Sequence, residues 1–270
     1  MSVFPPKDMP HERGLPAPAR WPWPTLIAHR GAGTLAPENT LAAFRTGQAN
    51  GYRMMEYDVK LSADDVPILL HDATIDRTSD ARGRAASMTL ADMLRHDFGA
   101  WHAAMYAGEP IPTLYAVAAY TRANQLHSNI EIKPCPGREV LTGTLVAKAA
   151  RALWSDALLP PLLSSFSEDA LAAAHTVAPE LPRALLIEDE LPPDWLARVQ
   201  KLRCRGLNLN HRHVTEKLVH DITSKGYTLV AWTVNDMQRA QELLDWGCHA
   251  VVTDHIGTIT PNTVRLPDRR

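Results

Sequence analysis

Short, mostly apolar runs recur along the chain, and segments long enough to form a helix separate most of them. Apolar runs of about four to eight residues, bounded by polar or turn-forming residues, are typical of buried strands. We interpret eight of these runs as strands, at residues 25–29, 54–60, 129–133, 162–166, 183–187, 206–210, 228–233 and 250–253. The intervening segments predict helices at about residues 37–50, 138–156, 168–177, 193–201, 214–226 and 237–247, and one that begins near residue 113.

Eight strands that alternate with helices predict an α/β fold of the (β/α)₈ type, a TIM barrel. A further apolar run at residues 67–71 is expected to pair with the strand at 54–60 as a hairpin. Residues 73–112 then interrupt the repeat, and this segment is too long for a simple loop. We interpret it as a small insertion after the second strand region, which lies at the rim of the barrel, covers the site and contacts the substrate.

The two ends of the chain do not follow the repeat. Residues 1–24 are rich in proline and close on Trp21-Pro-Trp-Pro, so we interpret them as an N-terminal arm that packs over the bottom of the barrel. The barrel is expected to span residues 25–260, and residues 261–270 to form a C-terminal tail.

The composition allows one large core, because 45% of the 270 residues are hydrophobic. A formal net charge of −2 without a long basic run argues against a nucleic-acid partner. Three widely spaced cysteines predict neither a disulfide framework nor a zinc site, and they favour a reducing compartment. Without a signal peptide or an apolar run of about eighteen residues, we expect a cytoplasmic protein with no integral membrane segment. Whether it forms a homo-oligomer stays open.

Three acidic residues fall on predicted strands. Glu56 and Asp58 are two residues apart, so they point to the same face of their strand, and Glu131 and Lys133 repeat that spacing. In a TIM barrel the C-terminal ends of the strands carry the chemistry. Three carboxylates without sulfur ligands favour a cofactor of the Mg²⁺ or Ca²⁺ type. The alternative is that one of the acids only forms a salt bridge with Lys133 or Arg30.

Two histidines and two cations accompany these acids. His29 ends the first predicted strand and His71 ends the hairpin, so we interpret them as an acid–base pair. The residues leave open which is the acid and which the base, and our working assignment is His29 as the base and His71 as the acid. The alternative for each is a structural histidine in the core. Arg30 and Lys133 indicate an anionic ligand, and the planar guanidinium of Arg30 suits phosphate oxygens.

Two further polar residues lie at the predicted helix start. Glu38 either reaches the metal or orients His29, or it only compensates the positive end of the helix dipole. Asn39 is interpreted as a helix-capping residue.

Eight motifs, in order between about residues 25 and 258, together resemble the glycerophosphodiester phosphodiesterases. They are His29-Arg30-Gly31, Pro37-Glu38-Asn39-Thr40, Glu56-x-Asp58, His71-Asp72, Asn129-Ile-Glu-Ile-Lys-Pro134, Leu163-Ser-Ser-Phe166, Ala231-Trp-Thr-Val-Asn235 and Thr253-Asp254.

The resemblance implies a TIM barrel with an insertion and a divalent metal held by Glu56, Asp58 and Glu131. It implies that His29 and His71 are the family's paired acid–base histidines. It also implies that Arg30 and Lys133 are the family's phosphate-binding cations, and that Trp232 is the aromatic residue near the glycerol. The family cleaves glycerophosphodiesters such as glycerophosphocholine to sn-glycerol 3-phosphate and an alcohol.

The chain departs from the family pattern in its N-terminal arm, in the hairpin turn, where the change affects the turn and not the site, and in the insertion. Asp64-Asp65 replaces the usual Asp-Gly in the hairpin turn, and residues 98–110, with Trp101 and His102, are longer than expected. The longer segment leaves the substrate specificity open. A lysophospholipase D and, less favoured, a non-catalytic phosphodiester-binding barrel are the alternative functions. The mixed polar character of the insertion favours small water-soluble diesters.

Overall fold

The computed structural model describes residues 20–266, and the first 19 residues of the predicted arm and the last four of the predicted tail lie outside that range. The strands in it are β1 (Leu26–Ala28), β2 (Met54–Leu61), β3 (Pro67–Leu69), β4 (His127–Ile132), β5 (Leu162–Ser165), β6 (Arg183–Ile187), β7 (Gly206–Asn210), β8 (Thr228–Trp232) and β9 (Ala250–Thr253).

Eight of these strands are parallel and close into a barrel, because β1 pairs with β9 on one side and with β2 on the other. The ninth, β3, pairs antiparallel with β2 outside the ring, so the hairpin predicted from the sequence is present. Asp58 lies opposite Glu131 in the β2–β4 ladder. The predicted (β/α)₈ barrel is therefore confirmed.

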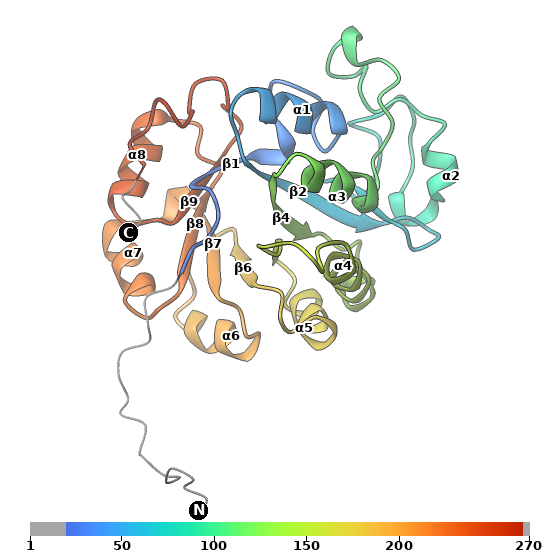
Figure 1. Ribbon diagram of the computed structural model, residues 1–270. Coiled ribbons are helices and arrows are strands. Elements are labelled where there is room, and N and C mark those ends of the chain that lie inside the picture. Colours follow the sequence, from blue (N-terminus) through green and yellow to red (C-terminus); the bar gives the residue numbers. More distant parts are fainter. Residues whose placement is uncertain (1–19, 267–270) are drawn as a thin grey trace, which may run out of the picture.

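The helices surround the strands (Figure 1). They are α1 (Leu41–Ala49), α2 (Leu90–Met93), α3 (Leu114–Ala123), α4 (Glu139–Leu153), α5 (Glu168–Val177), α6 (Trp195–Lys201), α7 (Glu216–Thr223) and α8 (Met237–Asp245). Most begin at a hydroxyl or carboxylate that accepts a backbone N–H of the first turn, which satisfies a donor the helix leaves unpaired. These N-caps are Thr40, Thr89, Thr113, Ser167, Thr215 and Asp236.

Several predicted boundaries were too wide. The helix predicted at 37–50 begins only at Leu41, because Asn39 has a positive φ of 60° and the Thr40 side chain caps the helix. The interpretation of Asn39 as the cap was therefore wrong. The strands predicted to reach His29 and His71 end at Ala28 and Leu69. His29 therefore begins a short 3-10 helix, His29–Gly31, and His71 lies in the loop after β3.

Residues 73–112 lie between β3 and α3 and protrude beside α1 (Figure 1). Their apolar side chains form a small cluster with the hairpin, which includes Ile68, Ile75, Met93, Phe98 and Ile111. The insertion therefore does not carry a separate core but shares one with β3. In the hairpin turn Asp65 adopts φ 62°, the conformation that glycine usually supplies there.

The bottom of the barrel interior is apolar. Trp21 and Trp23 pack there against Met54 and other side chains from the N-terminal halves of the strands, and the indole N–H of Trp23 donates to the Pro160 carbonyl over 3.1 Å. The described end of the arm thus closes the bottom, as expected. At the other end of the chain Val264 is buried, and the Arg265 N–H donates to Gln241 on α8.

Among residues 20–266, none of the helices has the length and apolar character needed to cross a bilayer.

Candidate active site

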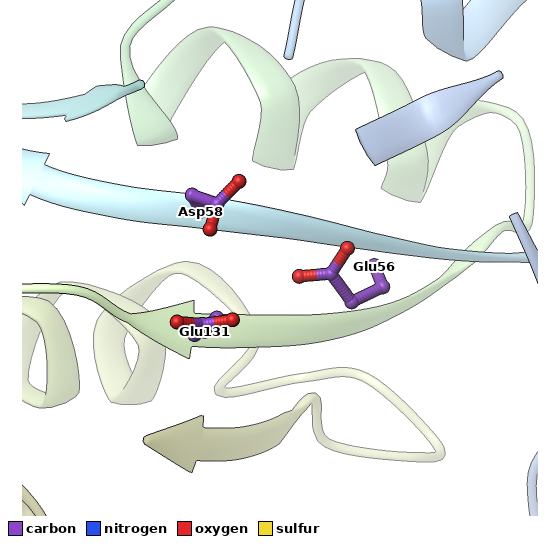
Figure 2. A group of neighbouring side chains, drawn as sticks. All are labelled: Glu56, Asp58 and Glu131. Carbon is purple, nitrogen blue, oxygen red and sulfur yellow. The ribbon is translucent and has the colours of Figure 1, made fainter. Parts of the chain in front are cut away.

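Three carboxylates meet at the mouth of the barrel. Glu56 and Asp58 lie on β2 and Glu131 on the neighbouring β4, as Figure 2 shows. All three residues are buried, and one oxygen from each lies within 4.8 Å of the others. The alternation of side chains along the strands places them there, as the sequence predicted.

Asp58 is the most heavily supported of the three. The Asn39 amide donates to its Oδ2 over 2.9 Å, and its backbone N–H donates to Asn39 Oδ1. Arg30 Nε lies 3.4 Å from Oδ2, and Lys133 Nζ lies 3.4 Å from Oδ1. The salt bridges considered as an alternative from the sequence are therefore formed: both cations contact Asp58, and Lys133 also contacts Glu131.

The other two acids receive less positive charge. Lys133 donates to Glu131 over 3.0 Å, whereas the one hydrogen bond that Glu56 accepts within residues 20–266 comes from the backbone N–H of Arg30, whose φ is 49°. Burial, aided by the charge of Asp58, raises the pKa of Glu56 to about 7 and that of Glu131 to about 8. Burial acts on Asp58 too, but Arg30 and Lys133 outweigh it and hold its pKa well below the usual range.

These carboxylates fit a divalent cation. Three buried carboxyl groups share two neighbouring cations, and the raised pKa values of Glu56 and Glu131 reflect this shortage of positive charge. Oxygen donors of this kind are the ligands that Mg²⁺ and Ca²⁺ prefer. The buried acidic cluster therefore indicates a divalent metal site.

His29 forms one of two His–Asp pairs at the mouth. It follows β1, and its Nδ1 donates to Asp254 Oδ1 over 2.6 Å, while Asn235 donates to the other oxygen of Asp254 over 2.9 Å. His29 Nε2 lies 3.8 Å from Glu56. Burial lowers the pKa of His29, but the bond to Asp254 and the charge of Glu56 outweigh it, so the net shift is upward.

His71 forms the second pair, on the side of the insertion. Its Nδ1 donates to Asp72 over 2.7 Å, and Arg77 donates to Asp72 over 2.8 Å and to Glu38 over 2.6 Å. Glu38 also accepts from Arg30 over 2.8 Å. Burial lowers the pKa of His71 below its ordinary value, and the attraction of Asp58 does not offset this.

Glu38 contacts two arginines. Its carboxylate joins Arg30 to Arg77 and makes no contact with His29 among the hydrogen bonds and ion pairs of the described residues. It therefore acts as a bridge between the barrel and the insertion. Arg77 was missed as a site residue, because nothing in the sequence indicates that the insertion folds back onto Glu38.

A cavity of about 130 Å³ opens beside the carboxylates. His29, His71 and Lys133 line one side of it, and two aromatic side chains, Phe166 and Trp232, meet edge to face at 5.6 Å on the other. The ammonium group of Lys133 lies 5.6 Å from the centre of the Phe166 ring. All eight predicted site residues thus gather around one end of the barrel: His29, Arg30, Glu56, Asp58, His71, Glu131, Lys133 and Trp232.

The sequence analysis assigned no role to Asp72, Asp254 or Asn235. Asp72 directly follows His71, and Asp254 directly follows β9, so their positions at strand ends were the available signal. Their pairing with the histidines depends on contacts across loops, which spacing does not reveal.

The closed parallel barrel, with acids, imidazoles and cations gathered at the C-terminal ends of its strands, defines a TIM-barrel hydrolase that acts on phosphate esters. The family model described as "Glycerophosphoryl diester phosphodiesterase family" matches residues 29–258. The chain belongs to this family, and it is an enzyme of the phosphoric diester hydrolase class.

Individual relatives agree over most of the chain. A glycerophosphodiester phosphodiesterase of Caldanaerobacter subterraneus is 30% identical over 244 residues, which cover 89% of this chain and 97% of that protein. A glycerophosphodiester phosphodiesterase of Bacillus subtilis is 27% identical over 242 residues, which cover 85% of this chain and 83% of that protein. The structure of an Oleispira antarctica phosphodiesterase in complex with the product sn-glycerol-3-phosphate is similar to this one, with 34% sequence identity and a TM-score of 0.81. The match covers 88% of this chain and 95% of the Oleispira antarctica chain.

Proposed function

We propose that the protein hydrolyses glycerophosphodiesters to sn-glycerol 3-phosphate and an alcohol, with a divalent cation and two histidines. The observation that carries the proposal is the cluster of three buried carboxylates, short of positive charge, beside two His–Asp pairs. The family membership and the product complex of the Oleispira antarctica relative support the substrate class.

Glu56, Asp58 and Glu131 would hold the cation, which we propose to be Mg²⁺ or Ca²⁺. When bound, it would polarise the phosphodiester and offset the charge that grows on the phosphoryl oxygens. Arg30 and Lys133 would bind the same oxygens. In favour of this role, Arg30 and Lys133 both line the cavity that opens beside the carboxylates.

The glycerol unit is assigned to the cavity of about 130 Å³, against Trp232. A cavity of this size suits a glycerol and not an attached acyl chain, so the lysophospholipase D alternative gains no support. His71 lines this cavity, whereas His29 lines both it and a more open groove beside Asp254. The alcohol, which varies between glycerophosphodiesters, is assigned to the open groove.

This placement favours acid and base roles opposite to those expected from the sequence, with His71 as the base and His29 as the acid. His71, next to the glycerol, would remove the proton of the nucleophile, either a water molecule or the glycerol 2-hydroxyl. Attack by the 2-hydroxyl would expel the alcohol and leave a cyclic phosphate, which water would then open to sn-glycerol 3-phosphate. His29, between the two cavities, would give a proton to the oxygen of the departing alcohol. Each Nδ1 is held by an aspartate, so Nε2 is the nitrogen left for proton transfer in both.

The test is hydrolysis of glycerophosphocholine with Mg²⁺, Ca²⁺ or Mn²⁺, with and without EDTA. We expect turnover that EDTA abolishes and a divalent ion restores. The ion should also raise the unfolding temperature, because a ligand present at about 100 times its Kd adds about 2.7 kcal/mol of stability. Glu131→Gln should lose both effects, and Glu139→Gln, on the outer helix α4, should keep them. Turnover that is indifferent to EDTA would contradict the metal role, and no turnover at all would favour the non-catalytic barrel.

A further inference from the structure

A second, more open groove of about 530 Å³ lies on the outer side of His29 and Arg30. Asp254 and the loop after β1 form one wall, and Trp101 and His102 of the insertion form the other. Because His29 and Arg30 line this groove as well as the glycerol-sized cavity, a phosphodiester held at Arg30 would extend one substituent into each.

Trp101 is held in an exposed position by its own loop. Its indole N–H donates to the Phe98 carbonyl over 2.9 Å, and 39% of the residue remains exposed. The Asp97 carboxylate accepts three backbone N–H groups of the same loop at 2.7 to 2.9 Å. His102 Nε2 donates to the Thr34 carbonyl over 3.1 Å, which ties the loop to the barrel. The loop that carries Trp101 is therefore held in place by its own hydrogen bonds and leaves the ring exposed.

The chemistry of the groove limits what the exposed ring can bind. With the N–H already used, the ring offers its face and its apolar edge but no hydrogen bond. Trp101 is the single large apolar side chain among the groove residues that the structure describes, so an alkyl chain would find little to pack against. The groove also holds two carboxylates, of which Asp254 is the more exposed. His29 and Asn235 contact Asp254, and Arg30 and Arg77 contact Glu38. An aromatic face beside a carboxylate suits an organic cation.

We propose that Trp101 is a specificity-determining residue, which binds the ammonium group of a cationic leaving alcohol, of the choline type, in this groove. The proposal rests on the proposed function, because it takes the alcohol of a glycerophosphodiester as the groove's occupant. The long 98–110 segment, in which the chain departs from the family pattern, would then select among glycerophosphodiesters by their alcohol.

The experiment compares glycerophosphocholine with its uncharged isostere, the glycerophosphodiester of 3,3-dimethylbutanol, in which carbon replaces nitrogen. The measured quantity is the ratio of kcat/KM for the two substrates. A cation–π contact predicts a preference for glycerophosphocholine that Trp101→Ala lowers by about 10-fold. Trp101→Phe should keep part of it, and Trp101→Leu, which keeps apolar bulk without a π face, should lose it. Met105→Ala, an exposed residue of the same insertion, is the matched control and should leave the ratio unchanged.

Two results would overturn the proposal: equal kcat/KM of the wild-type protein for both substrates, or a proportional loss on both in Trp101→Ala. Calorimetric titration with choline chloride separates this from failure of the proposed function. Choline should bind the wild-type protein about 10-fold more tightly than the Trp101→Ala variant, whether or not any diester is hydrolysed. Binding that does not depend on Trp101 would refute the proposal by itself.

Discussion

The two ends of the barrel interior are built from the same strand faces but have opposite chemistry. Along the inner face of β2, Met54 packs with the tryptophans at the bottom, and Glu56 and Asp58 follow it at the mouth. On β1 and the residue after it, Ile27 lies in the bottom cluster and His29 at the mouth. A step of two residues thus separates apolar packing from catalytic chemistry.

The difference teaches where stability and function reside. Burying apolar surface at the bottom favours folding. Burying carboxylates costs free energy, and it raises the pKa of Glu56 and of Glu131. The mouth is therefore short of positive charge, which a divalent cation would supply, and the apolar packing at the bottom, which needs no ligand, offsets the cost of burying the carboxylates.

The largest expected effect comes from removing either histidine of the mouth. His29→Ala and His71→Ala should each lower kcat for glycerophosphocholine by about 10²–10⁴, the usual contribution of a general acid or base. The unfolding temperature should change little, because neither histidine belongs to the apolar clusters of the described chain. A loss of kcat accompanied by a large fall in the unfolding temperature would contradict the view that the mouth serves function and the bottom serves stability.

A substrate with a better leaving group sharpens this result. The p-nitrophenyl ester of glycerol phosphate needs no proton on its departing oxygen, so it should restore most of the rate of His29→Ala and little of that of His71→Ala. Restoration in His71→Ala alone would return the roles to the sequence-based assignment, with His29 as the base.

The sequence predicted the strand-borne part of the site because strands have a fixed alternation. Glu56, Asp58 and Glu131 could be placed together once their strands were recognised as neighbours, and all three lie within one cluster. The same rule located Lys133. The number and order of the barrel strands followed from the repeat of apolar runs, since each run is local in sequence.

The parts that could not be predicted depend on loops. Asn39 holds Asp58 through a positive φ, and no periodic pattern indicates such a backbone conformation. Asp254 meets His29 across 225 residues of chain, and Arg77 reaches Glu38 from the insertion. These contacts depend on how segments far apart in the sequence fold against one another, and a single sequence contains no direct signal for that.

An intermediate effect is expected at the bottom. Trp23→Ala should lower the free energy of unfolding by about 3–5 kcal/mol, because it removes a large side chain from a packed cluster. Chemical denaturation measures this change, and kcat measured well below the unfolding temperature should stay the same. Trp23→Phe, which keeps most of the apolar volume, should lose less. A fall in kcat of the folded Trp23→Ala protein would show that the two ends are coupled.

The smallest effect is expected at the outer rim of the mouth, where Asp97 holds the Trp101 loop. Backbone N–H groups of Ala100, Gly108 and Gly99 lower the pKa of the Asp97 carboxylate. A lowered pKa means that the loop gains stability above the ordinary aspartate pKa of about 3.9 and loses it as the pH falls through the lower value of the folded state. Hydrogen-exchange protection factors of the three amides should therefore hold near neutral pH and fall in acid.

Asp97→Ala should abolish the protection at every pH, and the unfolding temperature should change little, because only local contacts are lost. Protection that survives in Asp97→Ala would mean that the loop is held by the barrel, through His102 and Thr34, and not by its own carboxylate.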